Sequence, residues 1–481
     1  MRIALIYPRI RGYDRESFGT NGYIANMSGY PPLSLAYAAS IIRRAGHDVL
    51  IIDANIMSLS GKEIVSRLKK FSPDLLGFTL TTPTFHGVRA WIRRIRVEVN
   101  VPVLAGGALL GLFPREVMGY QEFDYGIVGT ARDSLPALLG ALKKGRAPKM
   151  IPGVCLRDGG KVLVNFPVSG EEGVEDLLFP ARDLLPYERY FSPFSGGGGF
   201  TAMLASCGCP FSCSYCCLAG NLRFRKLDGV TAEMEECFKR YDIRNIDFYD
   251  SVFTCDRERV LRLCGAIRRL NLPFSWTART RLDLVDEEIL GAMSASGCRM
   301  LMYGIETFHA SSLRRVNRPV LSVAQIRESI RLTRKKGIAA FGFFMLGIPG
   351  ETEEIMKRTI NLSKCVGLDF AQFTKLTPIG GTALYDLQIK ATGDDYWRDY
   401  IGRGNRDDDI ASVGCTIPQV TLLKAVHRAN IGFYFRLPQI MRILFEARSF
   451  RRLLRYARSA LNMAFSRLKE GKKAGAPENM V

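Results

Sequence analysis

The sequence predicts an α/β protein with two parallel sheets in succession, followed by a helical C-terminal region. Residues 1–142 alternate short apolar strands with amphipathic helical segments, and residues 200–385 repeat this alternation. Continuous apolar strands between helices are typical of parallel sheets that are covered on both faces. A proline-rich stretch that ends in four glycines separates the two regions.

We therefore expect five regions along the chain. They are a doubly wound, Rossmann-like domain at 1–145, a linker with a small hairpin at 146–199, a partial (β/α)6 barrel at 200–385, a helical region at 386–468 and a disordered tail at 469–481.

The composition is typical of a globular protein in a reducing compartment. Hydrophobic residues make up 47% of the 481 residues, and the mean hydropathy is +0.02. Twelve cysteines without an N-terminal secretory signal favour free thiols over a disulfide framework. No apolar run reaches the length of about 18 residues that a membrane span needs. We expect a cytoplasmic location.

The excess positive charge is concentrated near the C-terminus. The formal net charge is +20, and residues 424–473 hold thirteen Lys and Arg against two Asp and Glu. Helical patterns are predicted at 417–436 and 438–467, the second with arginines beside an apolar stripe. Such a helix can lie on an anionic membrane, which would make the protein peripheral at the inner membrane face, or it can cap the barrel. Nucleic acid is disfavoured as a partner because these charges are not interleaved with aromatics on a sheet.

The N-terminal elements place small and hydroxyl-bearing residues at one edge of the first sheet. We predict strands at 2–7, 48–53, 74–80, 101–105 and 124–128, and helices at 33–44, 62–71, 86–97 and 133–143. Ligands of such sheets bind outside the carboxyl ends of the strands. Those ends carry Thr79, Thr81, Gly106, Gly107 and Gly129. Small residues allow a large flat ligand to approach the backbone, and hydroxyl groups can bind its polar rim.

The barrel elements gather polar residues and glycines in the same way. We predict strands at 201–206, 245–249, 274–278, 299–303, 339–346 and 370–375. Chemistry in barrels collects at the carboxyl ends of the strands. Residues at or just beyond those ends include Asp250, Arg281, Glu306, Gly347 and Pro349.

Three cysteines in the loop after the first barrel strand form the sharpest motif. Cys209, Cys213 and Cys216 follow the spacing CxxxCxxC, with Tyr215 before the last. Three thiolates can hold three corners of a cubane iron–sulfur cluster and leave the fourth iron open to a small molecule. The alternative is a structural zinc site, which would need a second Cys or His pair that we do not find.

The motif and the segments behind it resemble the radical S-adenosylmethionine (SAM) enzymes. The matching segments follow in order: YDSVFTCD, TARTRLD, YGIETF, MLGIPGET and TPIGGT. The resemblance implies a [4Fe–4S] cluster whose open iron binds SAM, with Tyr215 near the adenine. It further implies SAM contacts from Asp250, Arg281, Glu306, Gly347 and Pro349. Arg281 can pair the SAM carboxylate, and Asp250 or Glu306 can accept from its amino group or ribose.

The N-terminal region resembles the cobalamin-binding domain that precedes many radical SAM domains. The matching segments are GFTLTTPT, LAGGALLGLFP and DYGIVGT. The Asp-x-His-x-x-Gly motif that places a His below cobalt in other cobalamin proteins is absent from the sequence. Three interpretations remain open: cobalamin bound without a His ligand, a domain that has kept only the fold, and another nucleotide-like ligand.

The resemblance implies an enzyme that cleaves SAM reductively to a 5′-deoxyadenosyl radical and functionalises an unactivated carbon, by methyl transfer from methylcobalamin. It also implies a small-molecule or lipid-like substrate and an external reductant such as flavodoxin or ferredoxin. A non-methylating cyclase, similar to the anaerobic magnesium-protoporphyrin ester cyclase or to lipid ring-forming enzymes, is the alternative. A tRNA methylthiotransferase would need a second three-cysteine set, but only Cys155 precedes Cys207.

Overall fold

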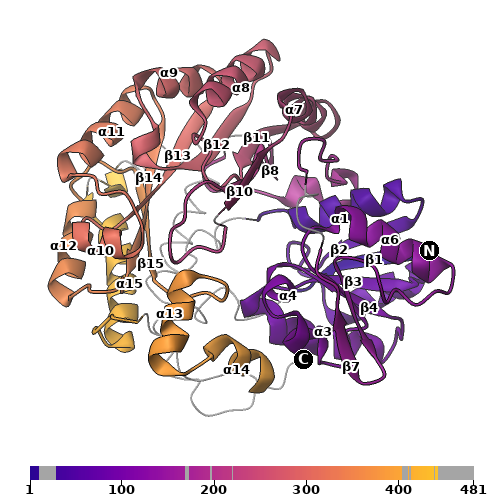
Figure 1. Ribbon diagram of the computed structural model, residues 1–481. Coiled ribbons are helices and arrows are strands. Elements are labelled where there is room, and N and C mark those ends of the chain that lie inside the picture. The colour runs from indigo at the N-terminus through magenta and orange to yellow at the C-terminus, as the bar shows by residue number, and fades with distance from the viewer. Residues whose placement is uncertain are drawn as a thin grey trace.

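The computed structural model describes residues 1–9, 29–167, 173–195, 198–218, 220–403, 410, 413–437 and 439–441. It contains two curved lobes, each built around a sheet, with α13 and α14 bridging them (Figure 1). The predicted α/β fold class is confirmed. The helix predicted at 438–467 lies almost entirely outside the described residues, as does the whole tail predicted at 469–481.

The N-terminal sheet has seven strands in the order β2-β1-β3-β4-β5-β6-β7. Its strands are β1 (Arg2–Tyr7), β2 (Asp48–Asp53), β3 (Leu75–Thr79), β4 (Val103–Gly106), β5 (Tyr125–Ile127), β6 (Val154–Asp158) and β7 (Lys161–Val164). Its helices are α1 (Leu33–Arg44), α2 (Gly61–Phe71), α3 (Phe85–Arg96), α4 (Ala108–Leu112), α5 (Pro114–Met118) and α6 (Ala131–Lys143). Strands β1 to β5 are parallel. One hydrophobic core packs against α1 and α6 and another against α2 to α5, so both faces are covered as the apolar strands predict.

The hairpin predicted within the linker belongs to the N-terminal sheet. Strand β6 pairs antiparallel with β5, and β7 pairs antiparallel with β6. Segment 154–164 therefore extends the first sheet at its edge, although the sequence analysis assigned 146–199 to a linker. The turn forms at Gly159 and Gly160, which both have positive φ.

The second sheet is six-stranded, entirely parallel, and ordered β15-β14-β13-β12-β11-β8. Its strands are β8 (Gly199–Met203), β11 (Ile243–Phe248), β12 (Ser275–Thr280), β13 (Cys298–Glu306), β14 (Ala339–Leu346) and β15 (Phe370–Lys375). The helices α7 (Leu227–Tyr241), α8 (Arg257–Arg269), α9 (Glu287–Ala295), α10 (Ala310–Arg315), α11 (Val323–Lys335) and α12 (Glu353–Ser363) lie outside the curved sheet (Figure 1).

Side chains alternate across this sheet as the strand period requires. In β12, Trp276 and Ala278 belong to the core beneath the helices. Thr277 and Arg279 point to the other face, where both donate to Asp247 of β11. Tyr30 of the N-terminal domain donates to the same carboxylate over 2.7 Å, which ties the first lobe to the barrel.

A short antiparallel hairpin, which the sequence analysis did not predict, carries the cysteine motif. It consists of β9 (Ser206–Cys209) and β10 (Gly220–Phe224). The first barrel strand therefore ends at Met203 and not at Ser206 as predicted. The backbone N–H of Ala205 donates to the Asp250 side chain, so the chain leaves the sheet there and enters the hairpin.

The C-terminal helices close the molecule. They are α13 (Ala383–Thr392), α14 (Tyr396–Arg403) and α15 (Gln419–Tyr434), and the last matches the helix predicted at 417–436. Helix α15 packs against β15, whereas Trp397 and Tyr400 of α14 are buried in the core of the N-terminal domain. His86 of α3 contacts the Tyr400 carbonyl at 2.8 Å. These aromatics therefore join the two lobes.

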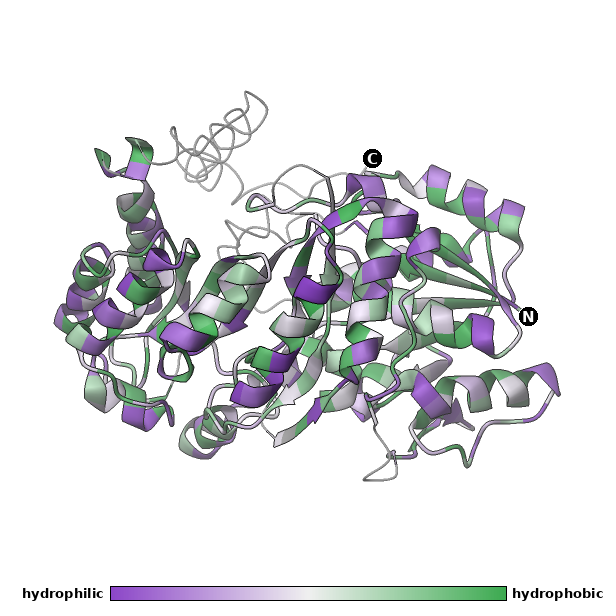
Figure 2. Cartoon of the chain, turned by 90° about the horizontal axis from the view of Figure 1, so that it is seen from above, coloured by the Kyte–Doolittle hydropathy of each residue, from purple (hydrophilic) through white to green (hydrophobic). Residues whose placement is uncertain are grey.

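The outer helices are mixed in hydropathy along their length, whereas the strands of the first sheet are mainly hydrophobic (Figure 2). Among the residues that the structure describes, no helix has the length and apolar character of a membrane span.

Candidate active site

The three motif cysteines lie on one short loop that follows β9. Cys209 is buried at the end of the strand, Cys213 and Cys216 are half-buried, and Cys217 is exposed. Burial raises the pKa of the Cys216 thiol, and the neighbouring Cys217, Cys213 and Cys209 add to the rise.

Three cysteine thiols on one loop suit a cubane iron–sulfur cluster. Across the described ranges of the chain, no three His, Cys, Asp or Glu side chains converge as the ligands of one ion would. In a [4Fe–4S] cluster each cysteine binds a different iron, so the sulfurs stand farther apart than around one zinc ion. Three thiols on one loop can therefore hold three corners of such a cluster. The assignment of Cys209, Cys213 and Cys216 as ligands stays a prediction.

The segment after α10 holds this loop in place. The Val316 carbonyl accepts from the Ser214 N–H over 3.2 Å. The Asn317 side-chain amide donates to the Ser212 carbonyl at 2.9 Å and to its hydroxyl at 2.8 Å. Asn317 has a φ of 53°, in the left-handed region, which asparagine tolerates better than most residues. The cysteine loop is thus fixed by a segment more than 100 residues away in sequence.

Tyr215, Glu306 and Arg318 form a polar network beside the loop. The Tyr215 hydroxyl donates to Glu306 Oε1 at 3.1 Å, and Arg318 Nη2 lies 3.5 Å from the same oxygen. Burial raises the pKa of Glu306, while Arg318 and Tyr215 counteract part of the rise. Arg318 also donates to the Gly304 carbonyl, and its Nη1 lies 3.9 Å from Cys213 Sγ. Two of the predicted SAM contacts, Tyr215 and Glu306, are therefore brought together.

Asp250 lies just beyond the end of β11, as the sequence analysis expected, and its carboxylate is bonded to the start of the cysteine hairpin. Its carboxylate accepts from the Ala205 N–H at 2.8 Å and from the Ser206 hydroxyl at 2.5 Å, and the residue is only 3% exposed. Burial raises the pKa of Asp250 to about 6 despite these hydrogen bonds. Both oxygens thus support the start of the cysteine hairpin, and a contact between Asp250 and SAM stays a prediction.

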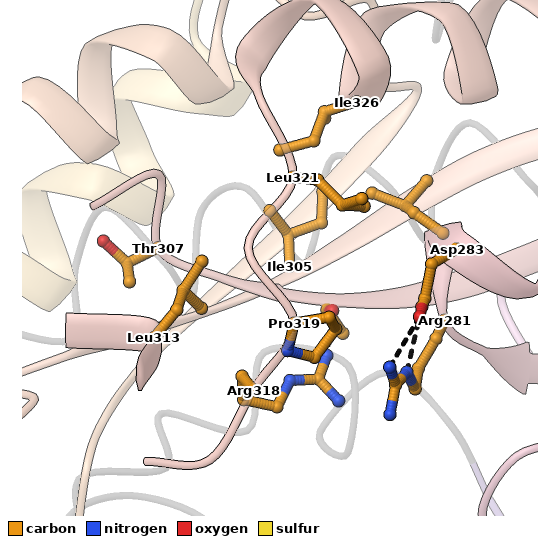
Figure 3. A pocket seen from close by; sticks show the side chains of 11 residues that line it. Arg281, Asp283, Ile305, Thr307, Leu313, Arg318, Pro319, Leu321 and Ile326 are labelled. Carbon is orange, nitrogen blue, oxygen red and sulfur yellow. Dashed lines mark hydrogen bonds and ion pairs between the residues drawn. The ribbon is translucent and has the colours of Figure 1, made fainter. Parts of the chain in front are cut away.

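Arg281 lies beside the cysteine loop at the edge of a pocket. Its guanidinium pairs with both oxygens of Asp283, at 2.9 and 2.6 Å, and lies 3.7 Å from the centre of the Phe211 ring. The pocket is lined by Arg281, Leu282, Asp283, Gly304, Ile305, Thr307, Leu313, Arg318, Pro319, Leu321 and Ile326 (Figure 3). For Arg281 to bind a ligand carboxylate, its ion pair with Asp283 would have to open or be shared.

The loop after β14 is stabilised by hydrogen bonds between its own residues. The Gly347 N–H donates to Glu351 at 2.6 Å, and the Ile348 N–H donates to the same oxygen at 3.3 Å. The Gly347 N–H is therefore engaged within the loop, and the predicted contact of Gly347 with SAM stays a prediction. Burial raises the pKa of Glu351 to about 7, and the two N–H donors counteract part of the rise. Pro349 lies between these groups and Gly350, whose N–H donates to the Gly414 carbonyl at 2.8 Å.

Two neighbouring glycines at the end of β4 have different surroundings. A Cβ on Gly107, whose φ is +103°, would lie 2.6 Å from the Leu80 carbonyl oxygen and 2.8 Å from Thr79 Oγ1. A Cβ on Gly106 would meet nothing within 4 Å. Gly107 is therefore needed for the close approach of two strand ends, and Gly106 leaves open space beside that edge.

The other residues predicted at this edge are also accounted for. The Thr81 hydroxyl lies 2.9 Å from the Thr84 hydroxyl, where a short 3-10 helix (Thr82–Thr84) begins. Gly129 has a φ of +80° at the turn from β5 into α6. These positions suit the open edge of a doubly wound sheet, where a flat cofactor would lie.

The loop after β15 contacts the segment that follows β4. Gly380 and Gly381, in the loop after β15, lie against the two residues at the end of α4, which begins directly after Gly107. A Cβ on Gly380 would be 2.6 Å from the Phe113 ring, and one on Gly381 would be 2.5 Å from Leu112. The loop that ends the barrel therefore touches the edge proposed for the second cofactor.

Sequence reasoning missed Asn317 and Arg318. Neither stands at a strand end, and their contacts with Ser212 and Cys213 span 105 residues. The available signal was a polar Asn-Arg pair before Pro319, at the end of a short helix that follows a barrel strand.

Family comparisons agree with the two lobes. Residues 27–139 match a model described as the B12 binding domain, and residues 203–363 match the radical SAM superfamily. An uncharacterised methyltransferase of Pyrococcus horikoshii is 30% identical over 94% of this chain and 96% of its own length. The anaerobic magnesium-protoporphyrin IX monomethyl ester cyclase of Rubrivivax gelatinosus is 25% identical over 79% of this chain and 68% of its own.

Solved structures share the fold. The radical SAM methyltransferase TsrM of Kitasatospora setae, with cobalamin and a [4Fe–4S] cluster bound, matches with a TM-score of 0.66 at 20% identity, over 81% of this chain and 78% of its own. The cobalamin-dependent radical SAM enzyme OxsB matches with a TM-score of 0.70 at 14% identity, over 97% of this chain and 72% of its own. The chain belongs to the cobalamin-dependent radical SAM enzymes, in the branch that carries a B12-binding domain before the radical SAM domain and includes methyltransferases.

Proposed function

We propose that the protein methylates an unactivated carbon of a small-molecule substrate. The observation that carries this proposal is the contact between the loop after β15 and the end of α4, because it brings the barrel mouth and the glycine-lined edge of the first sheet to one place. When bound, SAM on the cluster supplies a radical that removes a hydrogen atom, and cobalamin supplies the methyl group.

In this proposal the residues of the barrel hold and orient SAM. Cys209, Cys213 and Cys216 hold three irons, and Tyr215 lies beside the adenine. Glu306 is placed to accept a hydrogen bond from the amino group or the ribose, and Arg281 is placed to pair the carboxylate once Asp283 yields.

The residues at the edge of the first sheet hold cobalamin in this proposal. Gly106 leaves room for the flat ring, while Gly107 and Gly129 permit the tight turns beneath it. Thr79 and Thr81 supply hydroxyl groups at the polar rim. The sequence offers no His in the Asp-x-His-x-x-Gly context, so we expect a lower face without a His ligand.

The partners of this proposal are an external one-electron reductant, such as flavodoxin or ferredoxin, and an amphiphilic or lipid-like substrate. The basic segment 424–473 supports a peripheral contact with an anionic membrane from the cytoplasmic side. Sedimentation with anionic liposomes tests that contact. Salt-sensitive co-sedimentation would support it, and equal recovery with neutral liposomes would remove the lipid preference.

A second candidate function is ring closure or oxidation without methyl transfer. The relatedness to the magnesium-protoporphyrin ester cyclases of Rubrivivax gelatinosus and Cereibacter sphaeroides favours it. The two functions share SAM cleavage and differ in whether the product carries a new methyl group.

The first test is the cofactor content and SAM cleavage of anaerobically reconstituted protein. We expect bound iron and sulfide, retained cobalamin, and methionine with 5′-deoxyadenosine on reduction with SAM. Cys213→Ala should lose the cluster and the cleavage, whereas Cys365→Ala, at an exposed cysteine of the barrel, should keep both. Wild-type protein with neither cluster nor cleavage would overturn the proposal.

A further inference from the structure

Arg318 lies next to Cys213, one of the three cysteines predicted to hold the cluster. We infer that Arg318 sets the reduction potential of the cluster by holding a positive charge next to Cys213. This inference rests on the proposed function, since it requires a cluster on the three cysteines.

Arg318 is nearly buried and close to one ligand sulfur. Its side chain is 9% exposed, and its Nη1 lies 3.9 Å from Cys213 Sγ, at the long end for an N–H···S hydrogen bond. The Arg318 Nε has no hydrogen-bond partner within the part of the chain that the structure describes. An arginine side chain does not deprotonate in proteins, so this position carries a fixed charge.

The backbone fixes the distance between this charge and the sulfur. The residue before Arg318, Asn317, binds Ser212, and the residue before that, Val316, binds Ser214. Contacts on both sides of Cys213 therefore hold the loop against this segment. Figure 3 shows the Arg318 side chain at the floor of the pocket, near Pro319.

A fixed positive charge favours the more negative, reduced state of a cluster. The potential of an iron–sulfur cluster depends on net charge, hydrogen bonds to the sulfurs and exposure to solvent. Arg318 contributes through the first two, because it brings a charge and a donor to Cys213. Glu306, 3.5 Å from the guanidinium, offsets part of that charge. The potential is therefore set by the balance of this pair, with Arg318 raising it.

The test is a redox titration of the reconstituted holoenzyme, followed by the electron paramagnetic resonance signal of the reduced cluster. SAM is left out, so that a change in SAM binding does not enter the result. Arg318→Gln removes the charge, and Arg318→Lys keeps the charge but loses the planar fork. Arg314→Gln, on an exposed position of α10, is the matched control.

We expect Arg318→Gln to shift the midpoint potential to a more negative value, Arg318→Lys to shift it less, and Arg314→Gln to leave it unchanged. Iron and sulfide content and thermal unfolding confirm that each variant is loaded and folded. A loaded Arg318→Gln protein with the wild-type potential, or with a less negative one, would overturn the inference. If the Gln variant does not fold, Arg318→Met replaces it as the neutral variant, and a loaded Arg318→Met protein with the wild-type potential overturns the inference. A wild type without a cluster would instead refute the proposed function.

Discussion

The Tyr215 hydroxyl donates a hydrogen bond to Glu306 Oε1 over 3.1 Å, and this bond links the cysteine loop to the end of β13. Glu306 is 7% exposed and has a φ of +68°. A non-glycine residue in that conformation stores strain, which the surrounding contacts must offset. Tyr215 and Arg318 thus hold the carboxylate of a residue that is both buried and strained in its backbone.

Tyr215→Phe should destabilise the folded protein by about 1–3 kcal/mol, because it removes a hydrogen-bond donor from a buried carboxylate. Tyr249→Phe is the control, since Tyr249 is 53% exposed, and we expect a change within about 0.5 kcal/mol there. Chemical unfolding of the cluster-free proteins measures both. Equal stability of Tyr215→Phe and wild type would show that this hydrogen bond contributes nothing.

Of the two glycines at the end of β4, we expect Gly107 to be needed for folding and Gly106 for cofactor binding. Gly107→Ala should cost about 1–3 kcal/mol, because its positive φ and the nearby Leu80 carbonyl exclude a Cβ. Gly106→Ala should leave stability unchanged, since its Cβ meets nothing within 4 Å, yet it should lower the cobalamin retained after gel filtration. Full retention by Gly106→Ala would contradict the placement of cobalamin on that edge.

Glu351 predicts a particular pH dependence of stability. Its folded-state pKa is raised from 4.5 to about 7, so the folded protein binds a proton that the unfolded chain has lost. The stabilisation from this raised pKa is fully present below about pH 4.5. As the pH rises to about 7, the free energy of unfolding falls by roughly 3 kcal/mol. Glu351→Gln should remove this pH dependence. Chemical unfolding of both proteins at several pH values between 4.5 and 7 measures the difference in their free energies of unfolding. The exposed Glu354→Gln should keep the wild-type slope.

Trp397 joins the two lobes. It is 2% exposed, packs in the core of the N-terminal domain, and donates from Nε1 to the Pro378 carbonyl of the barrel at 2.8 Å. Trp397→Ala should destabilise the protein by about 3–5 kcal/mol, and Trp397→Phe by less, because the phenyl ring keeps most of the packing. Thermal unfolding ranks the variants. A wild-type melting temperature for Trp397→Ala would exclude α14 as a tie between the lobes.

The elements that the sequence predicted best are those with a strong local period. The bounds of β1, α1, β2, β14 and β15 agree with the predicted ranges. Strands β1, β2 and β14 are largely apolar runs and α1 is a helical repeat, and each of the five elements ends at or next to Gly, Pro or a charged residue. Hairpin β9–β10 was missed since Ser206–Cys209 has no apolar alternation and includes Gly208 at φ +81°.

The sequence predicted the residues of the site only where they belong to one short segment or to a strand end. The cysteine spacing and Tyr215 are local, and Glu306 lies at a strand end as expected. The hydrogen bonds from Ala205 and Ser206 to the Asp250 carboxylate were not predicted, because they depend on the tertiary structure. The Asn-Arg pair before Pro319 is visible in the sequence, but its contact with Cys213 spans 105 residues and depends on the tertiary structure.

The central claim, methyl transfer to carbon, is tested most directly in cells. A strain carrying the gene and its deletion strain are fed methionine with a trideuterated methyl group, and lipid and soluble extracts are compared by mass spectrometry. The account predicts a compound that carries the intact trideuterated methyl group in the parent strain and is absent, or lacks that group, in the deletion. A compound that disappears on deletion without ever carrying label would contradict methylation and favour ring closure or oxidation.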